Sequence, residues 1–151
     1  MATESSTATE TGVDLNEWQA GVIGGLAGGA VMGILMSVMN SAVLAAAIPA
    51  LYGLSGGVAG WIVHLSHGAV LGVGFAALAT SLGDRDTGVT VGLGIGWGVL
   101  AWIGLAALVM PLWLSAVGFP MAPPFPNFAI PSLLWHAVYG GVLGVAYAGL
   151  R

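Results

Sequence analysis

The chain has 151 residues, of which 58% are hydrophobic and 5% are charged, and it contains 26 glycines and no cysteine. A soluble globular domain carries about 25% charged residues, so this composition excludes most soluble protein classes. Two basic residues in the whole chain exclude a nucleic-acid-binding protein. The missing cysteine excludes disulfides, thiolate metal sites, iron–sulfur clusters and a cysteine nucleophile.

The first 17 residues are rich in Thr, Ser and Glu and contain neither Lys nor Arg. A cleaved signal peptide has the opposite composition, with a basic start and an apolar stretch. We therefore predict a disordered, acidic cytoplasmic tail over residues 1–17. The lysine-free chain, with a formal net charge of -4, suits the high-salt cytoplasm of a halophile.

Two long blocks contain no charged residue, from residue 18 to 83 and from residue 87 to 150. One bilayer crossing needs about 20 apolar residues, so each block is long enough for two crossings. We predict spans at residues 18–39, 58–82, 88–110 and 132–150. The predicted fold class is an all-α, polytopic membrane protein with four transmembrane helices in one domain, residues 18–151.

The charged residues indicate an orientation. Four spans place both ends of the chain and the Asp84-Arg85-Asp86 turn on the same side of the bilayer. Because Arg85 and Arg151 are the only basic residues, the positive-inside rule makes this side cytoplasmic. We therefore predict a multi-pass protein of the plasma membrane with both termini in the cytoplasm.

The two connectors on the opposite side, residues 40–57 and 111–131, carry no charge and hold all seven prolines. Apolar connectors of this kind lie in the membrane interface or dip back over the bundle. Four aromatic residues near this level are predicted to form an interfacial belt: Tyr52, Trp61, Trp113 and Trp135.

An internal repeat relates the two uncharged blocks. The segment WIVHLSHGAVLGVGFAAL, from Trp61, aligns with LLWHAVYGGVLGVAYAGL, from Leu133, at an offset of 72 residues. The first and third spans match at an offset of 71, which pairs Gly21 with Gly92, Gly25 with Gly96, Gly33 with Gly104 and Met39 with Met110. We therefore predict two tandem-duplicated helical hairpins with the same membrane orientation.

Small residues spaced four apart predict where the helices approach closely. The first span carries three overlapping GxxxG steps, and one ridge of the second span holds Gly60, His64, Gly68 and Gly72. His136 repeats His64 in the fourth span. Both histidines are expected to point toward neighbouring helices, at equal depth near the uncharged, outer face.

Histidine inside a spanning segment is a functional candidate, because an unpaired polar group in hydrocarbon is costly. The first hypothesis is that His64 and His136 are the two axial ligands of a haem b, in a small non-enzymatic subunit for electron transfer. Glycines beside each ligand would leave room for the macrocycle. A pathway for a proton or a small solute is an alternative, although few polar side chains could line it.

The second hypothesis is a copper site. His64 and His67 stand at an i, i+3 spacing, His136 lies opposite, and Met39 and Met110 are expected at about the same depth. Imidazole and thioether form a soft ligand set that suits copper. The structural alternative is that the methionines are packing residues and that each histidine bonds a carbonyl or hydroxyl of a neighbouring helix, which holds the hairpins in register.

The segment GLSGGVAG, residues 53–60, resembles the string around the nucleophile of rhomboid intramembrane proteases. This resemblance would make Ser55 a nucleophile and His136 its base. Rhomboids have more spans than the four predicted here, so we favour a turn or helix-cap role for Ser55 and assign no catalytic residue.

The tandem hairpin and its closing helix WHAVYGGVLGVAYAGL resemble small membrane proteins of halophilic archaea over residues 18–151. The resemblance implies the four-helix fold and brings no activity with it. The expected partners are the lipid bilayer and either other membrane protein subunits or a second copy of the chain.

Overall fold

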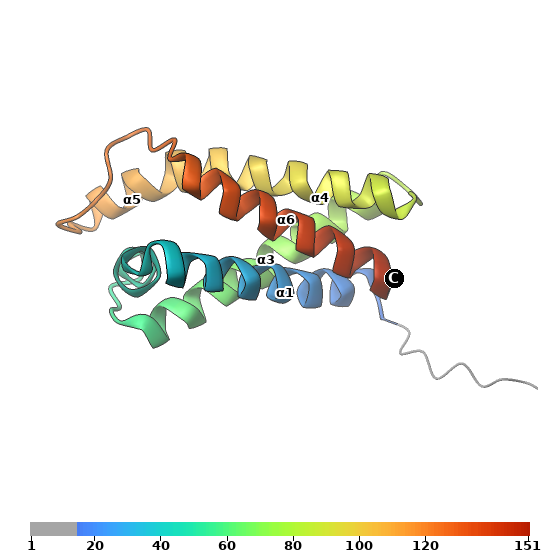
Figure 1. Cartoon of the computed structure of the whole chain (residues 1–151), viewed down its shortest axis with the longest axis horizontal. Helices are drawn as coiled ribbons and strands as arrows, with labels where there is room; N and C mark the ends of the chain where they lie inside the picture. The colour runs from blue at the N-terminus through green and yellow to red at the C-terminus, as the bar shows by residue number, and fades with distance from the viewer. Residues whose placement is uncertain (1–14) are drawn as a thin grey trace, which may run out of the picture.

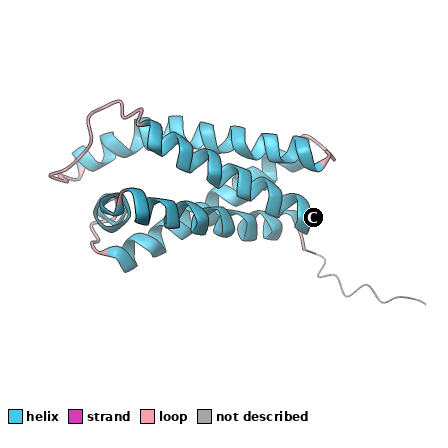
Figure 2. Ribbon diagram, viewed as in Figure 1, coloured by secondary structure: helices cyan, strands magenta, loops and turns pink. Residues whose placement is uncertain are grey.

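The computed structural model describes residues 15–151, and every regular element in this range is helical (Figure 1, Figure 2). Two of the elements, η1 and η2, are π-helices. Most of the predicted tail, up to residue 14, lies outside the described residues. The elements, in chain order, are α1 (Glu17–Met39), η1 (Val43–Ala47), α2 (Ile48–Ala50), α3 (Gly57–Ser81), α4 (Thr87–Ala101), η2 (Trp102–Val109), α5 (Met110–Ala116) and α6 (Ile130–Leu150).

Four helical stretches are long and apolar enough to cross a membrane: Glu17–Met39, Gly57–Ser81, Thr87–Ala116 and Ile130–Leu150. The prediction of helices only, four of them long and apolar enough to span, is confirmed for residues 15–151, and their length and composition suit a multi-pass membrane protein. Three of the stretches end close to their predicted limits. The third is longer than predicted, because the chain stays helical through Met110 and Pro111 as far as Ala116.

Two prolines lie inside helical segments without ending them. Pro49 follows η1 and Pro111 follows η2. A proline within a helix lacks an N–H donor, and its ring clashes with the carbonyl four residues earlier. The wider turn of a π-helix joins residues five apart and makes room for such a ring. Part of each predicted connector is therefore helical, up to residue 50 in one and up to residue 116 in the other.

The four long helices pack in the order α3, α1, α6, α4. α1 lies along both α3 and α6, and α4 lies along α6, whereas α3 and α4 touch little. The chain therefore forms two hairpins: the first consists of α1 and α3, the second of α4 and α6. Figure 1 shows α1 below and α4 above, with α3 rising behind the bundle toward the start of α4 and α6 running across toward α1.

Glycines bring the helix backbones of each hairpin into contact. A Cβ atom on Gly25 of α1 would collide with the carbonyl oxygen of Gly68 on α3, and one on Gly94 of α4 would collide with that of Gly140 on α6. Close backbone approach of this kind is typical of small-residue ridges in membrane helices and places Cα–H groups against carbonyl oxygens. The GxxxG ridge of the first span therefore packs where the sequence predicts a close contact.

The contacts relate the first helices of the two hairpins at a different offset from the one predicted. Gly25 and Gly94 make corresponding contacts and are 69 residues apart, not 71. The glycines that the sequence alignment had selected, Gly92, Gly96 and Gly104, have open space where a Cβ would lie. The difference arises because α4 carries two glycine ridges that are two residues apart, and only one of them faces α6.

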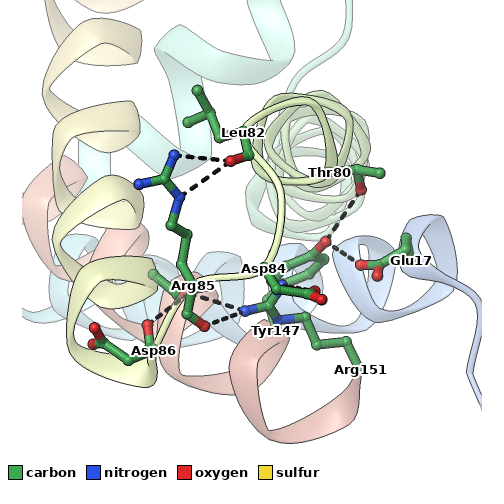
Figure 3. A network of polar contacts seen from close by, with 9 residues as sticks. Glu17, Thr80, Leu82, Asp84, Arg85, Asp86, Tyr147 and Arg151 are labelled. Carbon is green, nitrogen blue, oxygen red and sulfur yellow. Dashed lines mark hydrogen bonds and ion pairs between the residues drawn. The ribbon is translucent and has the colours of Figure 1, made fainter.

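A polar network joins both hairpins at the end of the bundle that carries the charged residues, which we call the charged end (Figure 3). The Tyr147 hydroxyl of α6 donates a hydrogen bond to the carboxylate of Glu17 on α1. The Arg151 guanidinium donates to the carbonyl of Arg85 (2.7 Å) and to the hydroxyl of Thr90 (3.3 Å), and lies over the Tyr147 ring. These contacts fasten α6 to α1 and to the start of α4.

Candidate functional site

A cavity of about 570 Å³ lies between the two hairpins, in the half of the bundle away from the charged end. Its size falls within the range of ligand and cofactor sites, roughly 300–1,000 Å³. Its walls are mainly apolar, and all three histidines of the chain line it. All four long helical stretches contribute to the lining, with Met36 from α1, Val70 from α3, Leu105 from η2 and Tyr139 from α6 among the lining residues.

The cavity exists because α3 and α4 are held apart. Trp97 of α4 points toward α3, where its indole N–H donates to the carbonyl of Leu71 (3.0 Å) and its ring lies against Gly74. From the opposite side, the Tyr139 hydroxyl of α6 donates to the carbonyl of Gly68 on α3 (2.8 Å). Tyr139 lines the cavity, and Trp97, which does not line it, joins α4 to the lining residue Leu71.

Trp97 is a contact residue that was not predicted, although the sequence carries a signal for it. Trp97 lies in the middle of a predicted span, far from the interfacial level where tryptophan is common in membrane proteins. A tryptophan at such depth needs a partner for its N–H group. That requirement predicts a contact with another helix, which is what the bond to Leu71 provides.

His136 lines the cavity and leaves one ring nitrogen without a partner among the described residues. Its Nδ1 donates to the carbonyl of Ser132 in the same helix (2.7 Å), so the hydrogen resides on Nδ1 and Nε2 carries a lone pair in the neutral ring. Nε2 has no hydrogen-bond partner within residues 15–151. The one fully buried polar side-chain atom without a partner in that range is Nε1 of Trp102, so Nε2 of His136 keeps accessible surface.

His64 is engaged differently from His136. Its Nε2 donates to the carbonyl of Gly29 on α1 (2.9 Å), and the side chain is 7% exposed. This bond joins the two helices of the first hairpin, as expected for a histidine that holds helices in register. The structure therefore separates two residues that the sequence repeat treats as equivalent.

The connector of the first hairpin closes the cavity at the uncharged end. The Tyr52 hydroxyl is hydrogen-bonded to Nε2 of His67 on α3 (2.7 Å), with the two rings 5.7 Å apart. The indole N–H of Trp113 on α5 donates to the carbonyl of Leu51 (2.9 Å). The connector is thus fastened to α3 on one side and to α5 on the other.

The predicted metal ligands do not come together as a cluster. Among the described residues, no three His, Asp or Glu side chains form a group that could hold a metal ion. Met110 lines the cavity, but the sulfur of Met39 accepts the indole N–H of Trp135 (3.1 Å) and Met39 does not line it. The structure therefore does not assemble the predicted copper set of His64, His67, His136, Met39 and Met110.

Two further predictions concern the uncharged end. Ser55 is exposed in the turn before α3, as favoured from the sequence, and does not line the cavity that contains His136, so the Ser55–His136 pair that the rhomboid resemblance would require does not occur there. Trp135 was predicted in the interfacial belt, but it is 5% exposed and lines the cavity. Tyr52 and Trp113 are exposed, as a belt requires.

No protein-family model, no curated protein and no solved structure matches the chain. A function is therefore inferred from the cavity, its apolar walls and the different bonding of its three histidines.

Proposed function

We propose that the protein is a small, non-enzymatic subunit of the plasma membrane, with both termini in the cytoplasm, that holds one lipophilic molecule in the cavity between its hairpins. The observation that carries the proposal is Nε2 of His136, which lacks a partner and belongs to a residue that lines an apolar cavity. A polar atom in such surroundings is costly unless it is paired. A bound molecule would supply the pairing.

Haem b is the specific cofactor predicted from the sequence, and the residues fit it in part. A ligating histidine commonly donates one ring N–H to a backbone carbonyl and binds the metal through the other nitrogen. His136 has this arrangement. His64 does not present Nε2, because that nitrogen donates to Gly29, so ligation by both histidines through Nε2 does not fit this geometry. A haem held by His136 would supply one-electron transfer.

The proposal is tested by identifying what the purified protein carries. The full chain is purified from membranes, its absorption spectrum is recorded, and bound compounds are extracted with organic solvent for mass spectrometry. We expect one lipophilic compound in stoichiometric amount in the wild type and in Ser66→Ala, and its loss in His136→Phe. Ser66 is the control because its hydroxyl bonds the carbonyl of Ile62 within α3 and it does not line the cavity.

A Soret band in the wild type would identify the compound as haem. Bulk lipid alone, in equal amounts in all three proteins, would overturn the proposal.

A purely structural subunit is the second candidate, and the bond from His64 to Gly29 favours it. In that case the histidines only stabilise the bundle and the cavity is filled by bulk lipid chains. It predicts that His64→Ala lowers thermal stability in detergent while His136→Ala changes neither stability nor the set of co-purifying compounds.

A further inference from the structure

The cavity opens at the side of the bundle, between α3 and the stretch formed by η2 and α5. Its most exposed lining residues are Val70 of α3 (71%), Tyr52 of the connector (61%), Trp113 of α5 (53%) and Val109 of η2 (51%). These residues form the rim of the opening. No charged residue lies between residues 18 and 83 or between 87 and 150, so the rim lies in an apolar part of the chain. In the proposed membrane orientation, the opening faces the hydrocarbon of the bilayer.

Most hydrogen-bond donors of the cavity wall are already bonded within the protein. Three donors bond to acceptors within the protein: the indole N–H groups of Trp113 and Trp135 and the hydroxyl of Tyr139. The Tyr52 hydroxyl and His67 bond one another. Within residues 15–151, four polar side-chain atoms of the lining remain available to a ligand: the Ser132 hydroxyl, Nδ1 of His67, and two nitrogens that can only accept in the neutral ring, Nδ1 of His64 and Nε2 of His136.

The lining also excludes charged ligands. Neither of the two arginines of the chain lines the cavity, and both lie at the charged end. A phosphate or carboxylate in an apolar cavity without a cationic partner would pay a large desolvation cost. The occupant must therefore be neutral, mainly apolar, and able to donate a hydrogen bond.

We propose that the cavity takes a neutral lipophilic alcohol or phenol, which enters from the bilayer between α3 and η2 and donates its hydroxyl hydrogen to Nε2 of His136. This inference rests on the proposed function and narrows its ligand to one chemical class. An alcohol or phenol is an alternative to haem at this position, because a haem iron would be bound by the same nitrogen.

The test compares an alkylphenol that carries a photoreactive diazirine with its methyl ether, which has the same apolar body and no hydroxyl hydrogen. The full-length protein is placed in phosphatidylcholine nanodiscs, labelled with each compound, and digested so that labelled peptides of the cavity can be quantified. We expect the phenol to label the cavity about tenfold more strongly than the ether, since one hydrogen bond contributes about 1.4 kcal/mol.

Two variants connect this preference to the structure. In His136→Phe the phenol is expected to lose its advantage over the ether. In Val70→Trp, a change at an exposed rim position that spares the core, both compounds are expected to label the cavity several-fold less. Ser66→Ala is the control and keeps the wild-type ratio.

The outcomes separate this inference from the proposed function. Equal labelling of the cavity by phenol and ether, or a stoichiometric haem in the purified protein, would overturn the alcohol or phenol assignment and leave a lipophilic binding site in place. Labelling confined to residues outside the cavity, unchanged in His136→Phe and Val70→Trp, would overturn both.

Discussion

The glycine contacts of the two hairpins match α1 with α4 and α3 with α6. The contact between α1 and α6 therefore corresponds to the contact between α3 and α4. α1 presents Gly24 and Gly28 to α6, and a Cβ on either would press against Leu143 or Tyr139. At an offset of 69 residues, these two glycines fall on Leu93 and Trp97 of α4. The first contact is close along its length, and the second is loose.

The difference between the two contacts explains how two hairpins with corresponding glycine contacts can enclose a cavity. Two small residues let α6 close onto α1, whereas two large ones at the matching positions hold α3 away from α4. The hydrogen bond from Trp97 to Leu71 fixes that separation at one depth. Toward the uncharged end, the described residues of α3 and η2 form no comparable hydrogen bond, and the cavity opens between these two elements.

The largest effect is expected where the close contact is blocked. In Gly28→Val, the new Cβ would meet the carbonyl oxygen of Tyr139 at 2.6 Å, and a helix backbone cannot yield as a side chain can. We expect a loss of about 3 kcal/mol or more in the free energy of unfolding, measured in detergent micelles, because overpacking against backbone is at the upper end of its usual cost. Gly92→Val is the control, since a Cβ at Gly92 meets open space.

Replacing Trp97, which joins α4 to α3 across the loose contact, should lower the free energy of unfolding somewhat less. Trp97 is partly buried, and Trp97→Ala removes its packing on Gly74 as well as its hydrogen bond to Leu71. We expect a loss of about 2 kcal/mol, below the 3–5 kcal/mol typical of a fully buried tryptophan. Trp97→Phe keeps most of the ring and loses the N–H, so its cost should be about 1 kcal/mol. Equal stability of both variants and the wild type would show that Trp97 does not hold the helices apart.

The two repeat-equivalent histidines should differ in their contribution to stability. His64→Leu removes a bond between α3 and α1, which should cost about 1 kcal/mol, whereas His136→Leu removes only a bond to its own helix and should cost less than about 0.5 kcal/mol. Thermal unfolding of both variants in the same detergent checks the difference. A larger loss for His136 would contradict the assignment of the structural role to His64.

Sequence patterns identify the fold well because hydrophobic length and the absence of charge determine where helices can span a membrane. They also identify the ridge at Gly21 and Gly25, whose contacts with α3 follow from helical spacing alone. They do not give the end of the third helix, because a proline usually stops a helix and the π-turns before Pro111 are not encoded in a simple pattern. The spacing of the histidines brings all three to one cavity, but not to one metal ion.

What the sequence could not supply is the partner of each polar atom. His64 and His136 have the same surroundings in the repeat, yet one donates to Gly29 across the hairpin and the other to Ser132 within its helix. The second bond goes to a backbone carbonyl four residues earlier, which His64 also has at Gly60, so the spacing alone does not distinguish the two histidines. The bond to Gly29 depends on how closely α1 approaches α3, which only packing decides.

The smallest effect is expected at the glycine that the sequence and the structure assign differently. The alignment at an offset of 71 pairs Gly96 with Gly25 and so predicts a close contact there, whereas the structure leaves open space at Gly96 and places Gly94 against Gly140. Gly96→Ala should therefore change the free energy of unfolding by no more than about 0.5–1 kcal/mol, in the stabilising direction, because alanine favours the helix. Gly94→Ala, two residues away, should destabilise by about 1–3 kcal/mol, because its Cβ would collide with the carbonyl of Gly140. A stabilising Gly96→Ala together with a destabilising Gly94→Ala, measured in one detergent, would support the offset of 69. A destabilising Gly96→Ala together with a stabilising Gly94→Ala would instead support the offset of 71, with a different face of α4 toward α6.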